Sequence, residues 1–313
     1  MRRAALVFLV LALGLVIAPP AEASRVVILA PKPGSPSQVA ALVAASPLIG
    51  KLPSDLLPPL NAVGADGASY FYPAAKHTCS MVTQCDFGDV TSNRVIVLFG
   101  DSHAHMWLPA IAPVASDARM KLVLLWRPGC PADDVSVWEL STGTINKSCN
   151  AFRAMAIKEI QRLHAAVVLI ASRTSDVPVA GNPMTVDATW QAATAATIDA
   201  LQSPTTKVGV IQDVTALTAE LPNCLQHHPD AIQRCSSPNP NPRFRQRDAD
   251  EQAAAEVTGA TYLLTQPWLC TSVCSPVIGK MVAYLNNEHV SATYSEFLSR
   301  VLAAEMQPLL SRA

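Results

Sequence analysis

The stretch from Arg94 to Pro109, RVIVLFGDSHAHMWLP, changes from an apolar strand pattern to a helical pattern within four residues. Its first part, Val95 to Phe99, is a β-branched, apolar run of the kind that fills the middle of a parallel sheet. The residues after it predict a helix that packs back on the sheet. We therefore expect Ser102 at the carboxyl end of a strand, where ligands bind in open α/β sheets. The nearby helix N-terminus would favour an oxyanion.

A histidine near the end of the chain is the candidate partner of this serine. It belongs to the stretch 284–291, YLNNEHVS. A nucleophilic serine needs a base, and the last loop of a doubly wound fold reaches the same sheet edge. We therefore expect Ser102 and His289 to meet. In the purely structural alternative, Gly100 makes a tight turn and Asp101 or Ser102 only caps the helix.

The composition allows a substantial core. Of the 313 residues, 50% are hydrophobic and 15% are charged, which suits one large α/β domain or two small ones. The net charge of −1 gives no reason to expect nucleic acid as a partner. We interpret the neighbouring Arg243, Arg245 and Arg247 as part of a solvated loop, with binding of an anionic ligand as the minor alternative.

Residues 1–23 have the layout of a secretory signal peptide. Arginines at positions 2 and 3 precede an apolar run from Ala4 to Ala18, and a small-x-small site follows at Ala21 to Ala23. The apolar run has about 15 residues, fewer than the roughly 20 that a membrane-spanning helix needs. We expect cleavage after Ala23 and an exported mature chain; an uncleaved membrane anchor is the alternative.

Eight cysteines in an exported chain favour disulfide bonds. They fall into four neighbouring couples that each bracket one loop. We expect sequential pairing: Cys79–Cys85, Cys130–Cys149, Cys224–Cys235 and Cys270–Cys274. Zinc binding by neighbouring cysteines and histidines is the alternative; the candidates are Cys224, His227, His228 and Cys235, and His77 beside Cys79. Disulfide formation would remove the thiolates that zinc requires, and we expect no metal.

Strands alternate with helices from residue 93 to residue 313, which predicts a parallel sheet covered on both faces. The expected strands are 94–99, 121–126, 166–171, 207–212 and 261–265. The expected helices are 104–118, 149–163, 186–201, 250–257 and 291–310, and Pro109 and Pro113 are expected to kink or shorten the first of them. Ser291 is the candidate N-cap of the last helix.

Two segments do not follow this alternation. Residues 24–92 are rich in proline, which prevents long helices, and we expect an arm that wraps the main domain with one short helix near 37–45. Residues 215–249 are expected to form a long irregular insertion within the domain 93–313.

Several segments together resemble the SGNH hydrolases. They are FGDSHAHMWLPA (99–110), PGCP (128–131), Cys149 before a helix that leads into VVLIAS (167–172), WLCTSVCSP (268–276) and YLNNEHVSATY (284–294). The resemblance covers roughly residues 50–313. It is closest to the SGNH domain fused to membrane acyltransferases that O-acetylate cell-envelope glycans, particularly the actinobacterial type. It implies a three-layer α/β/α, flavodoxin-like fold, here as a free-standing exported protein without the membrane acyltransferase domain.

The same resemblance assigns the candidate catalytic residues. Ser102 would be the nucleophile and His289 its general base. An acidic residue is implied three positions before the histidine, but that position holds Asn286. Asparagine accepts a hydrogen bond from imidazole and adds no negative charge. In serine proteases the equivalent change costs roughly 10⁴ in turnover, because it favours the wrong tautomer. The adjacent Glu288 is expected to point elsewhere.

The oxyanion hole is only partly recognisable. The backbone N–H of Ser102 is the first candidate donor, and Gly129, just past the second strand, is the next. The asparagine that many SGNH enzymes present after a later strand is not recognisable here. Arg173 lies there instead. We interpret it as a structural ion-pair partner, and the alternative is that its positive charge substitutes for the missing asparagine. Asp101 completes the candidate oxyanion and substrate-binding set.

The leading hypothesis is acyl-ester chemistry on a carbohydrate of the cell envelope, as an esterase or an O-acetyltransferase that needs no cofactor. A membrane acyltransferase is the candidate acyl donor. The alternative, motivated by Asn286, is a glycan-binding or scaffold protein that kept the fold after losing efficient chemistry. His103 and His105 are expected to pack or cap rather than to serve as second bases.

Overall fold

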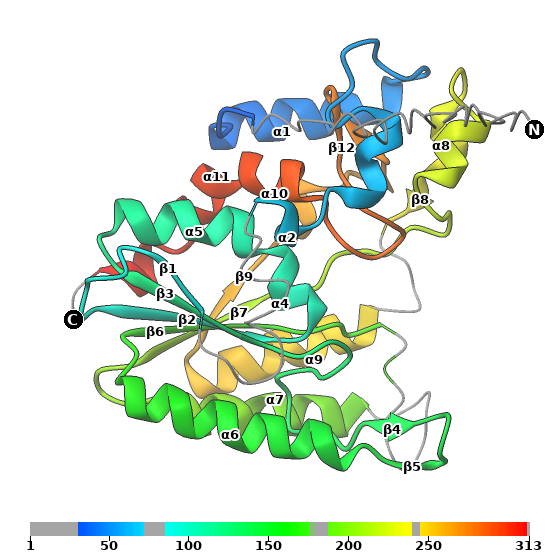
Figure 1. The fold of residues 1–313 in the computed structure, drawn as a ribbon. Helices are drawn as coiled ribbons and strands as arrows, with labels where there is room; N and C mark the ends of the chain where they lie inside the picture. Colours follow the sequence, from blue (N-terminus) through cyan, green and yellow to red (C-terminus); the bar gives the residue numbers. More distant parts are fainter. Residues whose placement is uncertain (1–30, 72–84, 176, 178–186, 240–244, 312–313) are drawn as a thin grey trace, which may run out of the picture.

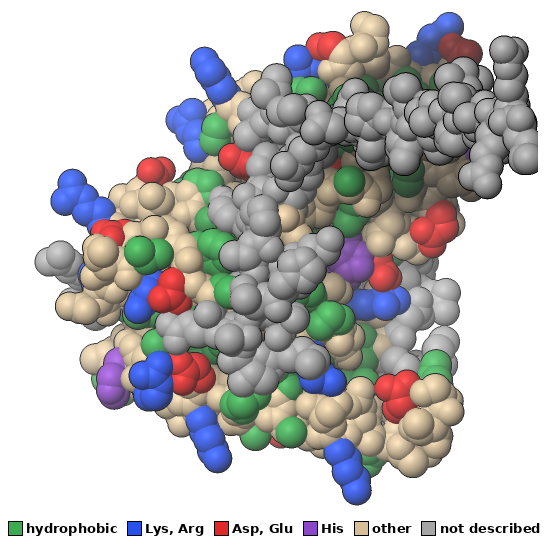
Figure 2. Space-filling view, viewed as in Figure 1, with side chains coloured by type: hydrophobic (Ala, Val, Ile, Leu, Met, Phe, Trp, Pro, Cys, Tyr) green, Lys and Arg blue, Asp and Glu red, His purple; other side chains and the backbone are tan. Residues whose placement is uncertain are grey.

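The computed structural model describes residues 31–71, 85–175, 177, 187–239 and 245–311 (Figure 1). The expected signal peptide and Cys79 lie outside these residues. Within the described part of the chain, no helix has the length and apolar character needed to cross a membrane. Lysine, arginine, aspartate and glutamate side chains are interspersed over the described part of the face that Figure 2 shows, as expected for a chain with a net charge near zero.

A six-stranded sheet in the order β1-β3-β2-β6-β7-β9 forms the middle layer. Its parallel strands are β2 (Val95–Gly100), β3 (Lys121–Trp126), β6 (Val167–Ala171), β7 (Lys207–Ile211) and β9 (Thr261–Leu263). If the five parallel strands are numbered 1 to 5 along the chain, their spatial order in the sheet is 2-1-3-4-5, as in flavodoxin-like folds. The predicted fold class is therefore confirmed.

Both faces of this sheet are covered, as Figure 1 shows. One face carries α5 (Leu108–Asp117), α10 (Ala292–Phe297) and α11 (Ser299–Glu305). The other carries α6 (Lys147–Leu163), α7 (Asp187–Leu201) and α9 (Arg245–Thr258). All six residues of β2 are buried. Ile96 and Leu98 belong to the core on the first face, whereas Val97 and Phe99 belong to the core on the second.

Prolines divide two of the expected helices. The segment expected as 104–118 forms α4 (Ser102–Met106) and α5, because Pro109, which has no N–H, lies in the first turn of the second helix. The segment expected as 291–310 forms α10, α11 and α12 (Gln307–Leu310), the last with a proline in its first turn. Ser291 caps α10 by accepting a hydrogen bond from the backbone N–H of Tyr294 at 3.1 Å, as expected.

The proline-rich segment contains more regular structure than expected. It forms α1 (Pro36–Ala45), which confirms the predicted short helix, then η1 (Ser46–Leu48), η2 (Leu60–Ala65) and α2 (Ala68–Phe71). It also supplies β1 (Cys85–Gly88), which pairs antiparallel with β3. The expected boundary between the N-terminal arm (24–92) and the main domain (93–313) therefore falls between two strands of one sheet.

The insertion contains short elements: α8 (Asn223–His227), η3 (Ile232–Cys235) and β8 (Ser237–Pro238). After it, α9 begins at Arg245 rather than near residue 250. The remaining short elements are β4 (Trp138–Glu139), β5 (Thr144–Ile145), η4 (Gln266–Trp268), β10 (Val273–Cys274), β11 (Val277–Ile278) and β12 (Met281–Val282).

Sequential pairing of the cysteines is confirmed for three couples. The bonds are Cys130–Cys149, Cys224–Cys235 and Cys270–Cys274. The second bond removes the two thiolates on which the zinc alternative in the insertion depended. The remaining predicted bond includes Cys79, which the structure does not describe.

Candidate active site

A close backbone approach fixes the turn that carries Ser102. A Cβ atom at Gly100 would lie 1.9 Å from the carbonyl oxygen of Ala171 in the next strand, so only glycine fits there. Asp101 then caps α4 by accepting a hydrogen bond from the backbone N–H of His103 at 2.8 Å. Its second carboxylate oxygen accepts one from the backbone N–H of Arg173 at 2.9 Å. Ser102 therefore begins α4 on a turn that is held against the carboxyl end of the neighbouring strand β6.

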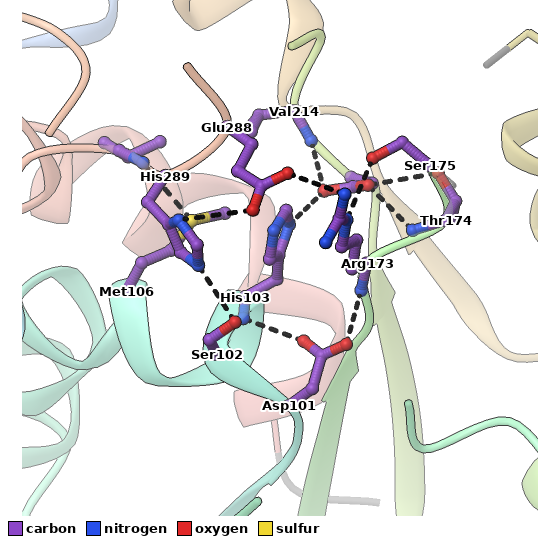
Figure 3. Close-up of polar contacts among 12 residues, drawn as sticks. Asp101, Ser102, His103, Met106, Arg173, Thr174, Ser175, Val214, Glu288 and His289 are labelled. Carbon is purple, nitrogen blue, oxygen red and sulfur yellow. Dashed lines mark hydrogen bonds and ion pairs between the residues drawn. The ribbon is translucent and has the colours of Figure 1, made fainter. Parts of the chain in front are cut away.

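The structure brings Ser102 and His289 together although they are 187 residues apart. His289 Nε2 lies 2.9 Å from Ser102 Oγ (Figure 3). Backbone contacts hold the histidine loop in place: the N–H of Leu285 donates to the carbonyl of His289 at 2.8 Å, and the N–H of Val290 contacts the sulfur of Met106 at 3.3 Å. Both loops lie at the carboxyl edge of the parallel strands, the edge expected from the sequence.

Asn286 orients this histidine through its side-chain oxygen. Oδ1 of Asn286 lies 3.1 Å from Nδ1 of His289 and also accepts the backbone N–H groups of Glu288 at 3.0 Å and His289 at 2.9 Å. Because two backbone donors point at this atom, it is the amide oxygen, and it faces the ring. Nδ1 therefore carries the proton and Nε2 faces Ser102 as the acceptor. The wrong-tautomer penalty expected from asparagine does not apply, and only the negative charge is missing.

The surroundings of His289 disfavour its charged form. Burial lowers its pKa to about 3, and the positive charges of His103 and Arg173 act in the same direction. The imidazole is therefore neutral at pH 7 and able to accept a proton. When His289 accepts a proton, nearby negative charge or hydrogen-bond acceptors must offset the free-energy cost of a buried imidazolium.

A buried histidine–carboxylate pair is formed by the residue that follows Ser102 in the chain. His103 Nδ1 is 2.5 Å from Oδ1 of Asp213, and both side chains are buried. Asp213 also accepts hydrogen bonds from the backbone N–H of Thr174 at 2.8 Å and of Val214 at 2.8 Å. Burial lowers the pKa of His103, but the carboxylates of Asp213, Asp101 and Glu288 outweigh it and raise that pKa. His103 thus forms a buried ion pair, in line with its expected structural role.

Asp213 is not among the site residues predicted from the sequence. It lies 110 residues from its partner, and no local pattern connects the two. One signal is present in the sequence: Asp213 lies two residues after the apolar strand that ends at residue 211, and the carboxyl ends of parallel strands share one edge of the sheet.

The expectation that Glu288 points elsewhere is wrong. Its Oε2 forms an ion pair with Nη2 of Arg173 at 2.9 Å, and its Oε1 lies 4.0 Å from Nδ1 of His289. Figure 3 shows this carboxylate between the guanidinium and the imidazole. Arg173 is thus an ion-pair partner, the structural one of the two roles considered for it.

The remaining oxyanion candidates differ in position. Gly129 has a φ of 64° on the loop after β3, with open space where a Cβ would lie. That loop begins beside the serine turn, because the N–H of Arg127 donates to the carbonyl of Gly100 at 3.1 Å. The carboxylate of Asp101, in contrast, is buried and occupied by two backbone donors, so it holds the turn rather than facing a substrate.

His105 has a packing role, as expected. Its ring stacks on Trp126 with ring centroids 4.1 Å apart and an interplanar angle of 6°. Nε2 of His105 lies 3.4 Å from the hydroxyl of Ser69. Burial lowers the pKa of His105 to about 4, so the ring is neutral at pH 7.

Comparisons with known proteins agree with this fold. Residues 69–304 match the family described as "SGNH domain (fused to AT3 domains)". Among solved structures, the chain is similar to the periplasmic domain of a lipopolysaccharide acetyltransferase from Salmonella ser. Paratyphi A. The TM-score is 0.58 at 15% sequence identity, over 76% of this chain and 96% of that one.

Two other structural neighbours are more distant. A carbohydrate acetylesterase from Sinorhizobium meliloti has a TM-score of 0.42 at 14% identity, over 69% of this chain and 99% of that one. A lipase/acylhydrolase from Enterococcus faecalis has a TM-score of 0.40 at 14% identity, over 70% and 100%. The comparison with curated proteins gave no match.

The fold and the serine–histidine pair at its sheet edge define an SGNH-type domain. The chain belongs to the family of SGNH domains that occur fused to AT3 domains.

Proposed function

We propose that this protein is an exported serine ester hydrolase or O-acetyltransferase that acts on acyl esters, foremost acetyl esters, of cell-envelope carbohydrate. The observation that carries the proposal is the 2.9 Å contact between Ser102 Oγ and His289 Nε2, with Asn286 fixing the tautomer in which Nε2 is the acceptor. Neither a packing serine nor a helix cap requires a neutral imidazole in that orientation.

The proposed reaction has two halves. Ser102 Oγ attacks the carbonyl carbon of the ester while its proton passes to Nε2 of His289. The backbone N–H of Ser102, with that of Gly129, binds the oxyanion of the tetrahedral intermediate. The alcohol then leaves with the proton from Nε2, and the acyl group stays on the serine. Water releases the acyl group in a hydrolase, whereas a sugar hydroxyl takes it in a transferase.

Several observations support the substrate class and the location. The structural neighbours include a lipopolysaccharide acetyltransferase and a carbohydrate acetylesterase, and the first of these is a periplasmic domain. The disulfide bonds suit an oxidising compartment outside the cytoplasm. The sequence of residues 1–23 favours export. We propose a membrane acyltransferase as the source of acyl groups if transfer is the physiological reaction.

The test is hydrolysis of a chromogenic acetate by the wild type and by Ser102→Ala. We expect wild-type turnover above background and none from the variant. Adding a carbohydrate acceptor decides between the two reactions: formation of acetylated sugar indicates a transferase, and unchanged release of acetate indicates an esterase. Equal rates from the wild type and from Ser102→Ala would contradict the catalytic proposal.

Two observations favour a second candidate, a glycan-binding protein with little or no turnover. Asn286 lacks the carboxylate charge, and the pKa of His289 is lowered to about 3, which makes it a weak base. For this candidate we expect Ser102→Ala to bind acetylated glycan as tightly as the wild type. A carbohydrate-binding assay on both proteins, run beside the turnover assay, distinguishes the two functions.

A further inference from the structure

We propose that Glu288, held in place by Arg173, is the positioning residue that supplies the negative charge absent from Asn286 and stabilises the imidazolium of His289. This inference rests on the proposed function. It divides between two residues a task that one aspartate performs in a serine–histidine–aspartate triad: Asn286 orients the ring and Glu288 provides the charge.

The placement of the two Glu288 oxygens carries the proposal. Oε2 is bound to Arg173 at 2.9 Å, which leaves Oε1 directed to the Nδ1 side of His289 at 4.0 Å. Among the described residues, no other carboxylate oxygen lies within 4.0 Å of a ring nitrogen of His289. The side chains of Glu288 and His289 are 19% and 18% exposed, so water screens their interaction only partly.

The carboxylate is rigidly held. The backbone N–H groups of Glu288 and of His289 donate to the same oxygen of Asn286, which fixes the two residues relative to each other. Arg173 is itself fixed, because its backbone N–H donates to Asp101 and its Nε to the hydroxyl of Ser175 at 3.3 Å. Glu288 therefore needs no rearrangement to act when a proton arrives on His289.

A charge is needed at this point of the site. When Ser102 gives its proton to His289, a positive charge forms beside His103, whose ring centroid is 4.8 Å away, and beside Arg173. The neutral amide of Asn286 offers only a dipole. Asp213 also favours the charged form of His289, but it is hydrogen-bonded to His103, whose positive charge it offsets. Glu288 is the carboxylate next to the ring of His289, and it also offsets part of the positive charge of Arg173.

The central experiment compares Glu288→Gln with the wild type in the chromogenic acetate assay. Glutamine keeps the shape and removes the charge. We expect kcat to fall by about 10-fold or more and KM to stay nearly unchanged. The reason is that an opposite charge close to an ionising group favours its charged form, and glutamine removes that charge. The acid limb of the pH profile of kcat/KM should move to lower pH. A purely structural role would not change kcat and the pH profile together.

Two further variants exclude a simpler explanation, that Glu288 only neutralises Arg173. In the double variant Glu288→Gln with Arg173→Gln, both charges are absent. We expect kcat to stay more than about threefold below wild type. In Glu288→Gln with Asn286→Asp, a carboxylate is placed directly at Nδ1, and we expect kcat to recover. Thermal unfolding of each variant shows that it is folded before its kinetics are compared.

The outcomes separate this inference from the proposed function. Wild-type activity that is lost in Ser102→Ala but unchanged in Glu288→Gln overturns the inference and leaves the proposed function intact. Recovery of kcat to within about threefold of wild type in the variant without both charges also overturns it. Failure of Asn286→Asp to rescue a folded Glu288→Gln protein does the same. Absence of Ser102-dependent activity in the wild type contradicts the proposed function as well.

Discussion

His103 and His289 lie side by side with ring centroids 4.8 Å apart, but among the residues that the structure describes only His103 has a carboxylate at hydrogen-bond distance. The two rings therefore have opposite properties. Asp213, with Asp101 and Glu288, raises the pKa of His103, whereas burial and the charge of His103 lower the pKa of His289. One ring serves as a fixed charge, and the other is free to accept a proton.

This difference predicts the pH dependence of turnover. The base acts only when His289 is neutral, and its pKa of about 3 keeps it neutral at much lower pH than an ordinary histidine. We expect the acid limb of kcat/KM that reports His289 to lie well below the usual value of about 6.5. Rates measured with the chromogenic acetate between pH 4 and pH 8 provide the test. An acid limb near pH 6.5 would contradict this assignment.

The His103–Asp213 pair should matter for stability. Replacing one partner leaves the other charge buried without compensation, so we expect His103→Gln or Asp213→Asn alone to lower the free energy of unfolding by about 3–5 kcal/mol. Replacing both, as His103→Gln with Asp213→Asn, removes both charges and should cost less than the sum of the single changes. Urea denaturation of the wild type and of the single and double variants measures the coupling. Additive losses would show that the pair does not interact.

Gly100 should be intolerant of any side chain. A Cβ would lie 1.9 Å from the carbonyl oxygen of Ala171. Neither β2 nor β6 can move to relieve this clash without breaking the pairing between them. We expect Gly100→Ala to destabilise the protein by about 3 kcal/mol or more and to displace Ser102. Gly64→Ala is the matched control, since among the described residues nothing beyond its chain neighbours and the backbone of its own helix lies within 4 Å of its Cβ position. Equal unfolding midpoints for the two variants would contradict the close approach.

Asp66 should give the protein a pH-dependent stability. It is buried, it accepts hydrogen bonds from the N–H and hydroxyl of Thr293 at the start of α10, and burial raises its pKa to about 7 from 3.8. Between about pH 4 and pH 7 the folded state holds a proton that the unfolded state has lost. Stability from this group is thus present at low pH and falls as pH rises, by about 1.4 kcal/mol per unit in that window.

The matched variant is Asp66→Asn, which cannot titrate. Relative to this variant, the wild type should be more stable at pH 5 than at pH 8 by roughly 3 kcal/mol. Urea denaturation of both proteins at the two pH values gives the difference. The same difference at both pH values would show that the carboxyl is ionised throughout.

Much of the fold follows from local pattern. The apolar runs at 95–100, 121–126 and 167–171 are long enough and sufficiently β-branched to predict buried parallel strands to within two residues. Strand β1 is not predicted by the sequence, because four residues with the sequence CDFG carry no periodic signal. It forms through pairing with β3, a tertiary contact that no window of the sequence contains.

The site was predictable only in part, for a similar reason. Ser102 and His289 each follow a recognisable motif, whereas the contacts of Arg173 with Glu288 and of His103 with Asp213 join residues more than a hundred positions apart. Arg247 illustrates the same limit. The interpretation as part of a solvated loop is wrong for this residue, because its guanidinium lies 4.6 Å from the ring centroid of Trp190 and donates to the carbonyl of Thr174.

The central claim is that Ser102 is a nucleophile activated by His289, and covalent labelling tests it most directly. A serine-directed fluorophosphonate is incubated with the wild type, Ser102→Ala and His289→Ala, and the modified residue is located by mass spectrometry. We predict a label on Ser102 in the wild type, slow labelling of His289→Ala and none at this position in Ser102→Ala. A folded wild-type protein that remains unlabelled at Ser102 would contradict the account.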